Sequence, residues 1–168
     1  MGICANYIGI ANEDIIKLKS DADLAEIVYA SEEGDYSVGV NIDKMWDALH
    51  FLLVGTSAIE IQEKNIVSMA IIGKDTITEG EDFVSIAVND KNSVRQIAKK
   101  LKNIDIHLAL ENDFDMQKFS DNDIYPDIWD FDDEEDEIKD DLKCCYENLY
   151  EFYYKMAKEN KAVFVMIT

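Results

Sequence analysis

Two carboxylates and an imidazole stand at helical spacing near the middle of the chain. Asp43, Asp47 and His50 occupy positions i, i+4 and i+7 of the run IDKMWDALHFLLVGTSA, so a helix would align them along one stripe. The hydroxyls of Thr56 and Ser57 follow within about two turns of His50. An imidazole beside a carboxylate can act as a general base, with a nearby hydroxyl as the nucleophile. The spacing therefore permits a small-molecule hydrolase or transferase that uses His50 with Asp47.

A structural or ligand-orienting role for the same residues is the alternative. Pairs of Asp and His one turn apart are common on helix surfaces, and no GxSxG elbow or other nucleophile motif is present in the sequence. We therefore assign no catalytic residue. The missing motif favours a protein that is not an enzyme.

Metal ions and cofactors are not indicated by the sequence. The chain has two histidines, and the acidic run DFDDEEDE at 130–137 lacks the spaced oxygens and the central glycine of an EF-hand loop. The seven glycines form neither a phosphate-binding loop nor a dinucleotide-binding fingerprint. We predict no metal site and no cofactor.

The segment from Glu111 to Asp141 carries most of the negative charge. It contains 15 acids against two lysines, within a chain whose net charge is −20. This charge repels phosphate groups, so nucleic acids and anionic membranes are not expected as partners. A basic protein or peptide is the complementary partner, while the oligomeric state is not indicated.

Aromatic residues interrupt this acidic segment. Tyr125, Trp129 and Phe131 alternate with aspartates, so the segment is too aromatic for a simple disordered acidic tail. Rings together with carboxylates suit the capture of a basic segment. Buried rings that anchor an ordered loop are the competing interpretation. The leading hypothesis is a small binding or regulatory module, with an immunity-type or inhibitor-type role as an example.

A helix over residues 42–55 is predicted to position the Asp–His stripe. Asp43 is its expected N-cap, and Gly55 can adopt the positive φ that ends a helix. One side of this helix is apolar and is expected to be buried, with Trp46 at its margin. The apolar side consists of Met45, Leu49, Leu52 and Leu53.

Three apolar runs predict the strands of a sheet. They are residues 3–10, 83–88 and 162–167, and the last is apolar throughout, as expected for the middle of a sheet. The apolar spacing predicts a long helix over 134–160 and a further helix that Asn89 or Asp90 caps and that runs to Leu101. Shorter predicted elements are a helix over 13–20 with Asn12 as N-cap, a helix over 21–30 and a turn at 78–80.

The composition predicts one domain over residues 1–168. The 168 residues are 48% hydrophobic, enough for one substantial core. Three cysteines without CxxC spacing indicate reduced thiols rather than a disulfide framework. No signal peptide and no long apolar segment is present in the sequence, so a soluble cytoplasmic protein is expected.

The run DKMWDALHFLLVGTSA resembles the signature of the YfbM-like family, a bacterial domain of unknown function. The N-terminal MGICANYIGI, the tripeptide Ile124-Tyr125-Pro126 and a long helix that leads into an apolar C-terminal strand agree with this family. The resemblance implies an α/β fold, which is a three-layer α/β/α sandwich with a small mixed sheet. It does not point to any particular activity. It also favours helices over 66–72 and 104–110, although 104–110 alternates like a strand. On the same grounds we expect Trp46, His50, the turn at 55–57 and Tyr125 to form one concave polar surface.

Overall fold

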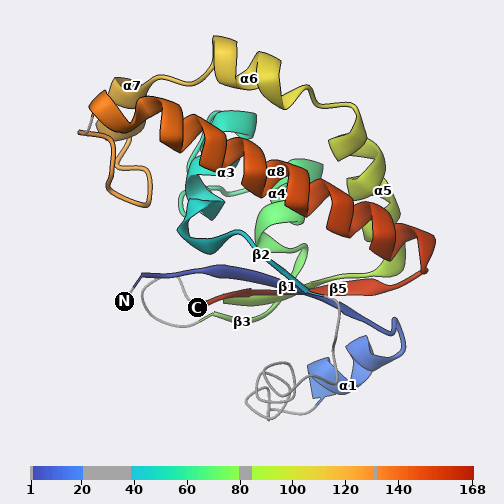
Figure 1. Cartoon of the computed structure of the whole chain (residues 1–168). Helices are drawn as coiled ribbons and strands as arrows, with labels where there is room; N and C mark the ends of the chain where they lie inside the picture. The colour runs from blue at the N-terminus through green and yellow to red at the C-terminus, as the bar shows by residue number, and fades with distance from the viewer. Residues whose placement is uncertain (1, 21–38, 80–84, 131) are drawn as a thin grey trace.

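The computed structural model describes residues 2–20, 39–79, 85–130 and 132–168. The strands of these residues form one sheet in the order β2-β1-β5-β4-β3 (Figure 1). They are β1 (Ala5–Ile10), β2 (Gly39–Asn41), β3 (Asp75–Glu79), β4 (Ser85–Asn89) and β5 (Ala162–Ile167). β5 lies in the middle, as its apolar sequence predicts, because both faces of a central strand are covered.

The helices of the described residues cover the two faces of the sheet unequally (Figure 1). The helices of the more heavily covered face are α3 (Trp46–Val54), α4 (Ile66–Ile72), α5 (Lys91–Lys102) and α8 (Glu135–Lys158), with α6 (Ile106–Asn112) and α7 (Met116–Asp121) further from the sheet. On the other face lies α1 (Asp14–Ser20), whose Leu18 packs with Ile8 and Phe164. The three-layer sandwich stays a prediction, because the predicted helix over 21–30 lies outside the described residues.

All neighbouring strands of this sheet are antiparallel, so the predicted mixed sheet is wrong. The path from β4 to β5 explains this. After β4 the chain crosses the helical layer through α5, α6 and α7, and α8 brings it back to the end of the sheet where β4 stopped (Figure 1). Asn89 therefore pairs with Val163, and β5 runs back along β4.

Local signals place several helices correctly. Asp90 is the N-cap of α5, where its side chain accepts hydrogen bonds from the backbone N–H groups of Asn92 and Ser93. The residues 66–72 form α4, and the ambiguous run at 104–110 is helical in α6, where Asp105 caps the first turn. The family resemblance was therefore a better guide to α6 than the alternation of its apolar residues.

Three local predictions are wrong. A short 3-10 helix, η1 (Asp43–Met45), precedes α3, and Asp43 does not cap it, because its carboxylate accepts from Cys4 Sγ at 3.1 Å. Asn12 does not cap α1, because its side chain accepts from the backbone N–H of Lys91 at 3.0 Å. Thr78 belongs to β3 rather than to a turn.

The C-terminal end of α4 is joined to the core by buried polar side chains. Asn89 donates to the carbonyl of Met69, Tyr153 donates to that of Ala70, and Tyr7 donates to that of Ile71, each at 2.8 Å. The last carbonyls of a helix have no partner within the helix. These side chains therefore satisfy them and connect α4 with β1, β4 and α8.

Candidate functional site

Helix α3, which carries the Asp–His stripe, is buried on both of its sides. It packs against α4, α6 and α8. Of the residues of its predicted apolar side, Leu49 and Leu52 are buried and Leu53 is half-buried. The side chains of Asp47 and His50 on the opposite side are 0% exposed. Asp43 lies in η1, before α3 begins, and bonds to Cys4. The predicted stripe is therefore divided between two elements, and its main part lies inside the protein.

Asp47 joins two loops through its carboxylate. Oδ1 accepts hydrogen bonds from Ser57 Oγ at 2.9 Å and from the backbone N–H of Ala58 at 2.6 Å. Oδ2 accepts from the backbone N–H of Tyr125 at 3.0 Å. Burial raises the pKa of Asp47 above its ordinary value, while the three hydrogen bonds oppose this shift because they favour the charged form. Asp47 therefore holds the turn after α3 against the loop that precedes α8.

His50 forms a second pair of buried hydrogen bonds. Its Nδ1 lies 2.8 Å from the carbonyl oxygen of Thr56, and its Nε2 lies 2.9 Å from Ser68 Oγ. A carbonyl can only accept, so Nδ1 carries the proton and Nε2 accepts from the hydroxyl of Ser68. Burial lowers the pKa of His50 below its ordinary value, which agrees with a neutral imidazole. Asp47 and His50 thus bond to different partners.

The contact between Ser68 and His50 has the arrangement of a nucleophile and its base. The Thr56 carbonyl fixes the imidazole, as a third group does in catalytic triads. However, the side chains of Ser68 and His50 are both 0% exposed. A substrate would reach Ser68 Oγ only after α3 and α4 had separated, so the contact is arranged for packing rather than for turnover.

Trp46 and Tyr125 hold the beginning of the chain in place. Trp46 Nε1 donates to the carbonyl of Ile3 at 3.1 Å, and the backbone N–H of Ile3 donates to Tyr125 Oη at 2.8 Å. The two rings lie with their centroids 5.8 Å apart. Trp46 is buried and Tyr125 is half-buried. Trp46, His50, the turn at 55–57 and Tyr125 therefore do lie together, with Trp46, His50 and Ser57 buried, Tyr125 half-buried and Gly55 and Thr56 exposed. The polar groups of Asp47, His50 and Ser57 face one another and their neighbours inside the protein, rather than lining a concave polar surface.

The Trp129 ring is an anchor inside the protein. Trp129 is 3% exposed, and its Nε1 donates to the carbonyl of Ile124. Its ring packs on Phe119 with centroids 4.6 Å apart, and Phe119 in turn packs edge-on against Phe51 of α3. Trp129 is therefore not placed to meet a partner. The competing interpretation, that buried rings anchor an ordered loop, describes it. Phe131 lies outside the described residues.

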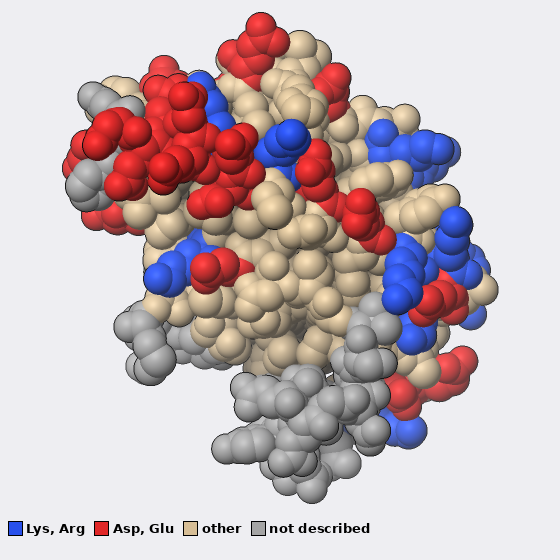
Figure 2. Space-filling view, viewed as in Figure 1, with Lys and Arg blue, Asp and Glu red and all other residues tan. Residues whose placement is uncertain are grey.

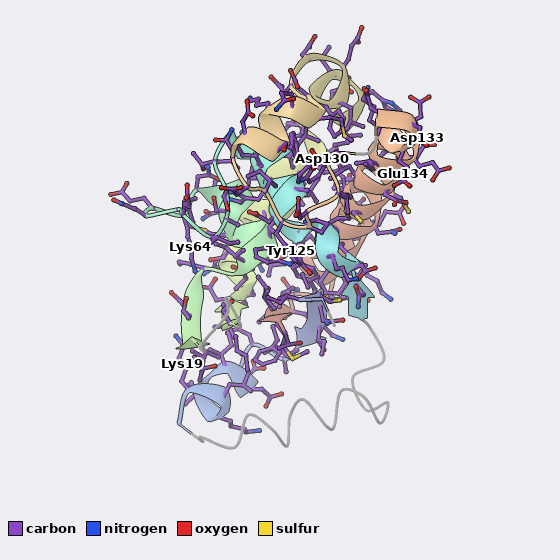
Figure 3. All side chains as sticks on the ribbon, turned by 90° about the vertical axis from the view of Figure 1, so that its left-hand side faces the viewer. Lys19, Lys64, Tyr125, Asp130, Asp133 and Glu134 are labelled. Atoms are coloured by element: carbon purple, nitrogen blue, oxygen red, sulfur yellow. The ribbon has the colours of Figure 1, made fainter. Side chains whose placement is uncertain are left out.

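The exposed carboxylates of residues 111–141 form what we call the acidic surface. In Figure 2 they gather over α7 and the first turns of α8, and in Figure 3 Asp133 and Glu134 point outward at the edge of this region. The acidic surface consists of Glu111, Asp113, Asp115, Asp121, Asp123, Asp127, Asp130, Asp133, Glu134, Asp136, Glu137, Asp140 and Asp141. The acids in the first turn of α8 also interact favourably with the positive end of its helix dipole.

The two lysines of this segment lie against aromatic rings. Lys118 Nζ is 5.4 Å from the centroid of the Phe51 ring, and Lys139 Nζ is 5.2 Å from that of Phe114. Lys139 also forms an ion pair with Glu135, which does not belong to the acidic surface. The acidic surface therefore keeps a strong negative charge.

Neither a metal-binding cluster nor a membrane-spanning helix is found in the described part of the chain. Over 2–20, 39–79, 85–130 and 132–168, no three His, Cys, Asp or Glu side chains converge on a position where they could hold a metal ion. Within these ranges no helix has the length and apolar character needed to cross a membrane.

Comparison with known proteins supports the resemblance seen in the sequence. A family model described as a domain of unknown function, DUF1877, matches residues 1–166. The chain belongs to the DUF1877 family. It is 27% identical to Protein YfbM of Escherichia coli strain K12 over 130 residues, which are 76% of each chain. The crystal structure of YfbM, described as a protein of unknown function, matches with a TM-score of 0.73 and 20% identity over 98% of this chain and 99% of that one.

Ser68 of this DUF1877 protein was missed in the sequence, although a signal for it exists. It is the single polar residue in the apolar run IVSMAII of α4. A hydroxyl in such a run must find a hydrogen-bond partner, because an unpaired polar group in a core is unfavourable. No comparable feature of the sequence indicates that the backbone N–H groups of Ile3 and Tyr125 take part in the hydrogen bonds of this site.

Proposed function

We propose that this DUF1877 protein is a binding module whose acidic surface engages a basic protein or peptide. The observation that carries the proposal is the concentration of exposed carboxylates on α7, on the following loop and on the start of α8. Such a surface attracts cationic groups over a distance comparable with the screening length, which is about 8 Å at physiological salt. It therefore accelerates encounter with a basic partner.

The frame beneath the acidic surface supports a role in recognition. Asp47 binds the backbone of Tyr125, and Trp129 and Phe119 fill the space below the loop. A partner would thus meet charges that are already held in place, which reduces the entropy lost on binding. Arginine side chains suit such a surface best, because each guanidinium can bind a carboxylate through two parallel hydrogen bonds.

The proposal differs from the expectation based on sequence in its short-range contacts. Trp129 is buried, so charge-assisted hydrogen bonds from the partner replace ring contacts to Trp129. A cytoplasmic inhibitor or immunity-type role fits a surface of this kind. The hydrolase alternative has no comparable support, because Asp47 and His50 are fully buried and bond to different groups.

Partner capture from an extract of the native host tests the proposal. The surface variant carries Asp127→Asn, Asp130→Asn, Asp133→Asn and Glu134→Gln. The control removes the same number of charges from exposed acids elsewhere, through Glu60→Gln, Glu63→Gln, Glu147→Gln and Glu151→Gln. Quantitative mass spectrometry then compares the proteins that each bait retains.

We expect a basic protein that the wild type and the control retain and the surface variant loses. Its association rate should fall as salt rises above about 0.15 M, while its dissociation rate changes less. Equal capture by all three baits would refute the proposal. Turnover of a small molecule that His50→Ala abolishes and the surface variant preserves would support the hydrolase alternative instead.

A further inference from the structure

A pocket lies on this protein between α3, α4, α5 and α6, and it shares Asp113 with the acidic surface. Its volume is about 480 Å³, within the range of roughly 300–1,000 Å³ that is usual for small-molecule sites. Most of its wall is aliphatic and half-buried. This part of the wall includes Leu53, Val54, Ile66, Ile104 and Ala109.

Two opposite charges complete the wall of the pocket. Lys100 comes from α5, and Asp113 follows the last turn of α6. Neither forms an ion pair with another described residue. An apolar recess whose lysine and aspartate form no ion pair within the described part of the chain is complementary to a molecule with an aliphatic body and two charged ends.

Asn65 adds a hydrogen-bond donor to the same wall. Its Oδ1 accepts from the backbone N–H groups of Val67 and Ser68, at 2.8 and 2.9 Å, because Asn65 is the N-cap of α4. This leaves the Nδ2 group without a hydrogen bond to any described residue. The amide can therefore donate to a carboxylate or carbonyl of a ligand in the pocket.

We propose that this pocket binds a short aliphatic peptide with both ends free. The carboxylate would face Lys100 and Asn65, the ammonium would face Asp113, and the side chains would fill the aliphatic part. The pocket volume of about 480 Å³ lies in the range of small-molecule sites, so a dipeptide is an occupant of suitable size. The aliphatic residues of the wall favour branched side chains over charged ones.

Titration with the dipeptide Leu-Leu, followed by the NMR signals of Ile66 and Ile104, tests this proposal on the full chain. Leu-Leu amide lacks the carboxylate, N-acetyl-Leu-Leu lacks the ammonium, and Gly-Gly lacks the aliphatic side chains. The variants are Lys100→Gln and Asp113→Asn. Lys99→Gln is the control, because Lys99 is an exposed neighbour of Lys100 on α5 that does not line the pocket.

We expect saturable binding of Leu-Leu and much weaker binding of Gly-Gly. Lys100→Gln should weaken Leu-Leu about two- to fivefold, as the loss of a solvent-exposed ion pair does, and should leave Leu-Leu amide unchanged. Asp113→Asn should weaken Leu-Leu to the same degree and leave N-acetyl-Leu-Leu unchanged.

Three results would each overturn the assignment. The first is that Leu-Leu up to about 10 mM does not shift the NMR signals of Ile66 and Ile104. The second is that Lys99→Gln lowers the affinity for Leu-Leu as much as Lys100→Gln does. The third is that Lys100→Gln lowers the affinities for Leu-Leu and for its amide equally. Because Asp127, Asp130, Asp133 and Glu134 do not line the pocket, the surface variant should bind Leu-Leu like the wild type. The two proposals can therefore fail independently.

Discussion

Asp47 and the carboxylates of the acidic surface lie in neighbouring parts of the fold but in opposite environments. Asp47 is fully buried and accepts three hydrogen bonds, one of them from Tyr125 in the loop that also carries Asp123, Asp127 and Asp130. The surface acids are exposed to solvent. A carboxylate therefore binds the loop inside the protein, whereas other carboxylates give the loop its charge at the surface. Removal of the buried carboxylate should lower the stability of the protein, and neutralising the surface carboxylates should raise it slightly.

Replacing Asp47 should have the largest effect. Asp47→Ala leaves the donors of Ser57, Ala58 and Tyr125 without their buried acceptor, and each such donor costs about 1–3 kcal/mol. We expect the free energy of unfolding to fall by about 4 kcal/mol in urea denaturation. Asp127→Ala is the matched surface change and should stay within about 0.5 kcal/mol of wild type. Similar values for the two variants would show that Asp47 does not hold the loop.

His50 should make stability depend on pH. Burial lowers its pKa in the folded state, so between that pKa and the ordinary value of about 6.5 the unfolded chain binds a proton that the folded protein does not. Its contribution to stability is full above about pH 6.5 and is lost as the pH falls through the folded pKa, with a slope of at most about 1.4 kcal/mol per pH unit.

Asp47 acts on the same profile with the opposite sign. Its raised pKa makes its contribution to stability full below about pH 3.9, and this contribution is lost as the pH rises through the folded pKa.

Urea denaturation of wild type and His50→Gln from about pH 8 to pH 5 isolates the contribution of the histidine as the difference in unfolding free energy between the two proteins. The gap should narrow as the pH falls. His107→Gln removes an exposed imidazole and is the control. A gap independent of pH would contradict a neutral buried imidazole.

Ser68→Ala should have a smaller effect than Asp47→Ala. It leaves Nε2 of His50 without its donor in the core, and we expect a loss of about 1–2 kcal/mol in the free energy of unfolding. Ser120→Ala in α7 is a suitable control, because the Ser120 hydroxyl forms no side-chain hydrogen bond with the described residues. Equal stability of the two variants would mean that the hydroxyl of Ser68 does not matter to the core.

Neutralising the acidic surface should have the smallest effect, with the opposite sign. The variant with Asp127→Asn, Asp130→Asn, Asp133→Asn and Glu134→Gln reduces repulsion among like charges. We expect its melting temperature to exceed that of wild type slightly at low salt and to equal it near 1 M salt, where the screening length is about 3 Å. A clear loss of stability at low salt would show that these carboxylates hold the fold together as Asp47 does.

Local chemistry was enough to place much of this fold. The apolar run at 162–167 predicted the central strand β5, and Gly55 predicted the end of α3, where it has φ 86°. Asn89 or Asp90 was the predicted cap of α5, and Asp90 is the residue that caps it. These features depend on the residues themselves and on their immediate neighbours. β3 was missed because its sequence DTITE is largely polar, and it lies at the edge of the sheet, where the apolar signal of a strand is weak.

The environment of Asp47 and His50 could not be obtained in this way. Helical periodicity correctly placed Leu49 and Leu52 in the core, but it also suggested that the polar side of α3 faces water. In the folded protein, His50 on that side bonds to Ser68 of α4, which is 18 residues further along the chain. Asp47 bonds to Tyr125 of the loop before α8, which is 78 residues further along. Contacts this distant depend on how whole elements pack. The periodicity of one helix cannot show them, because it records which side is apolar and not what covers the other side.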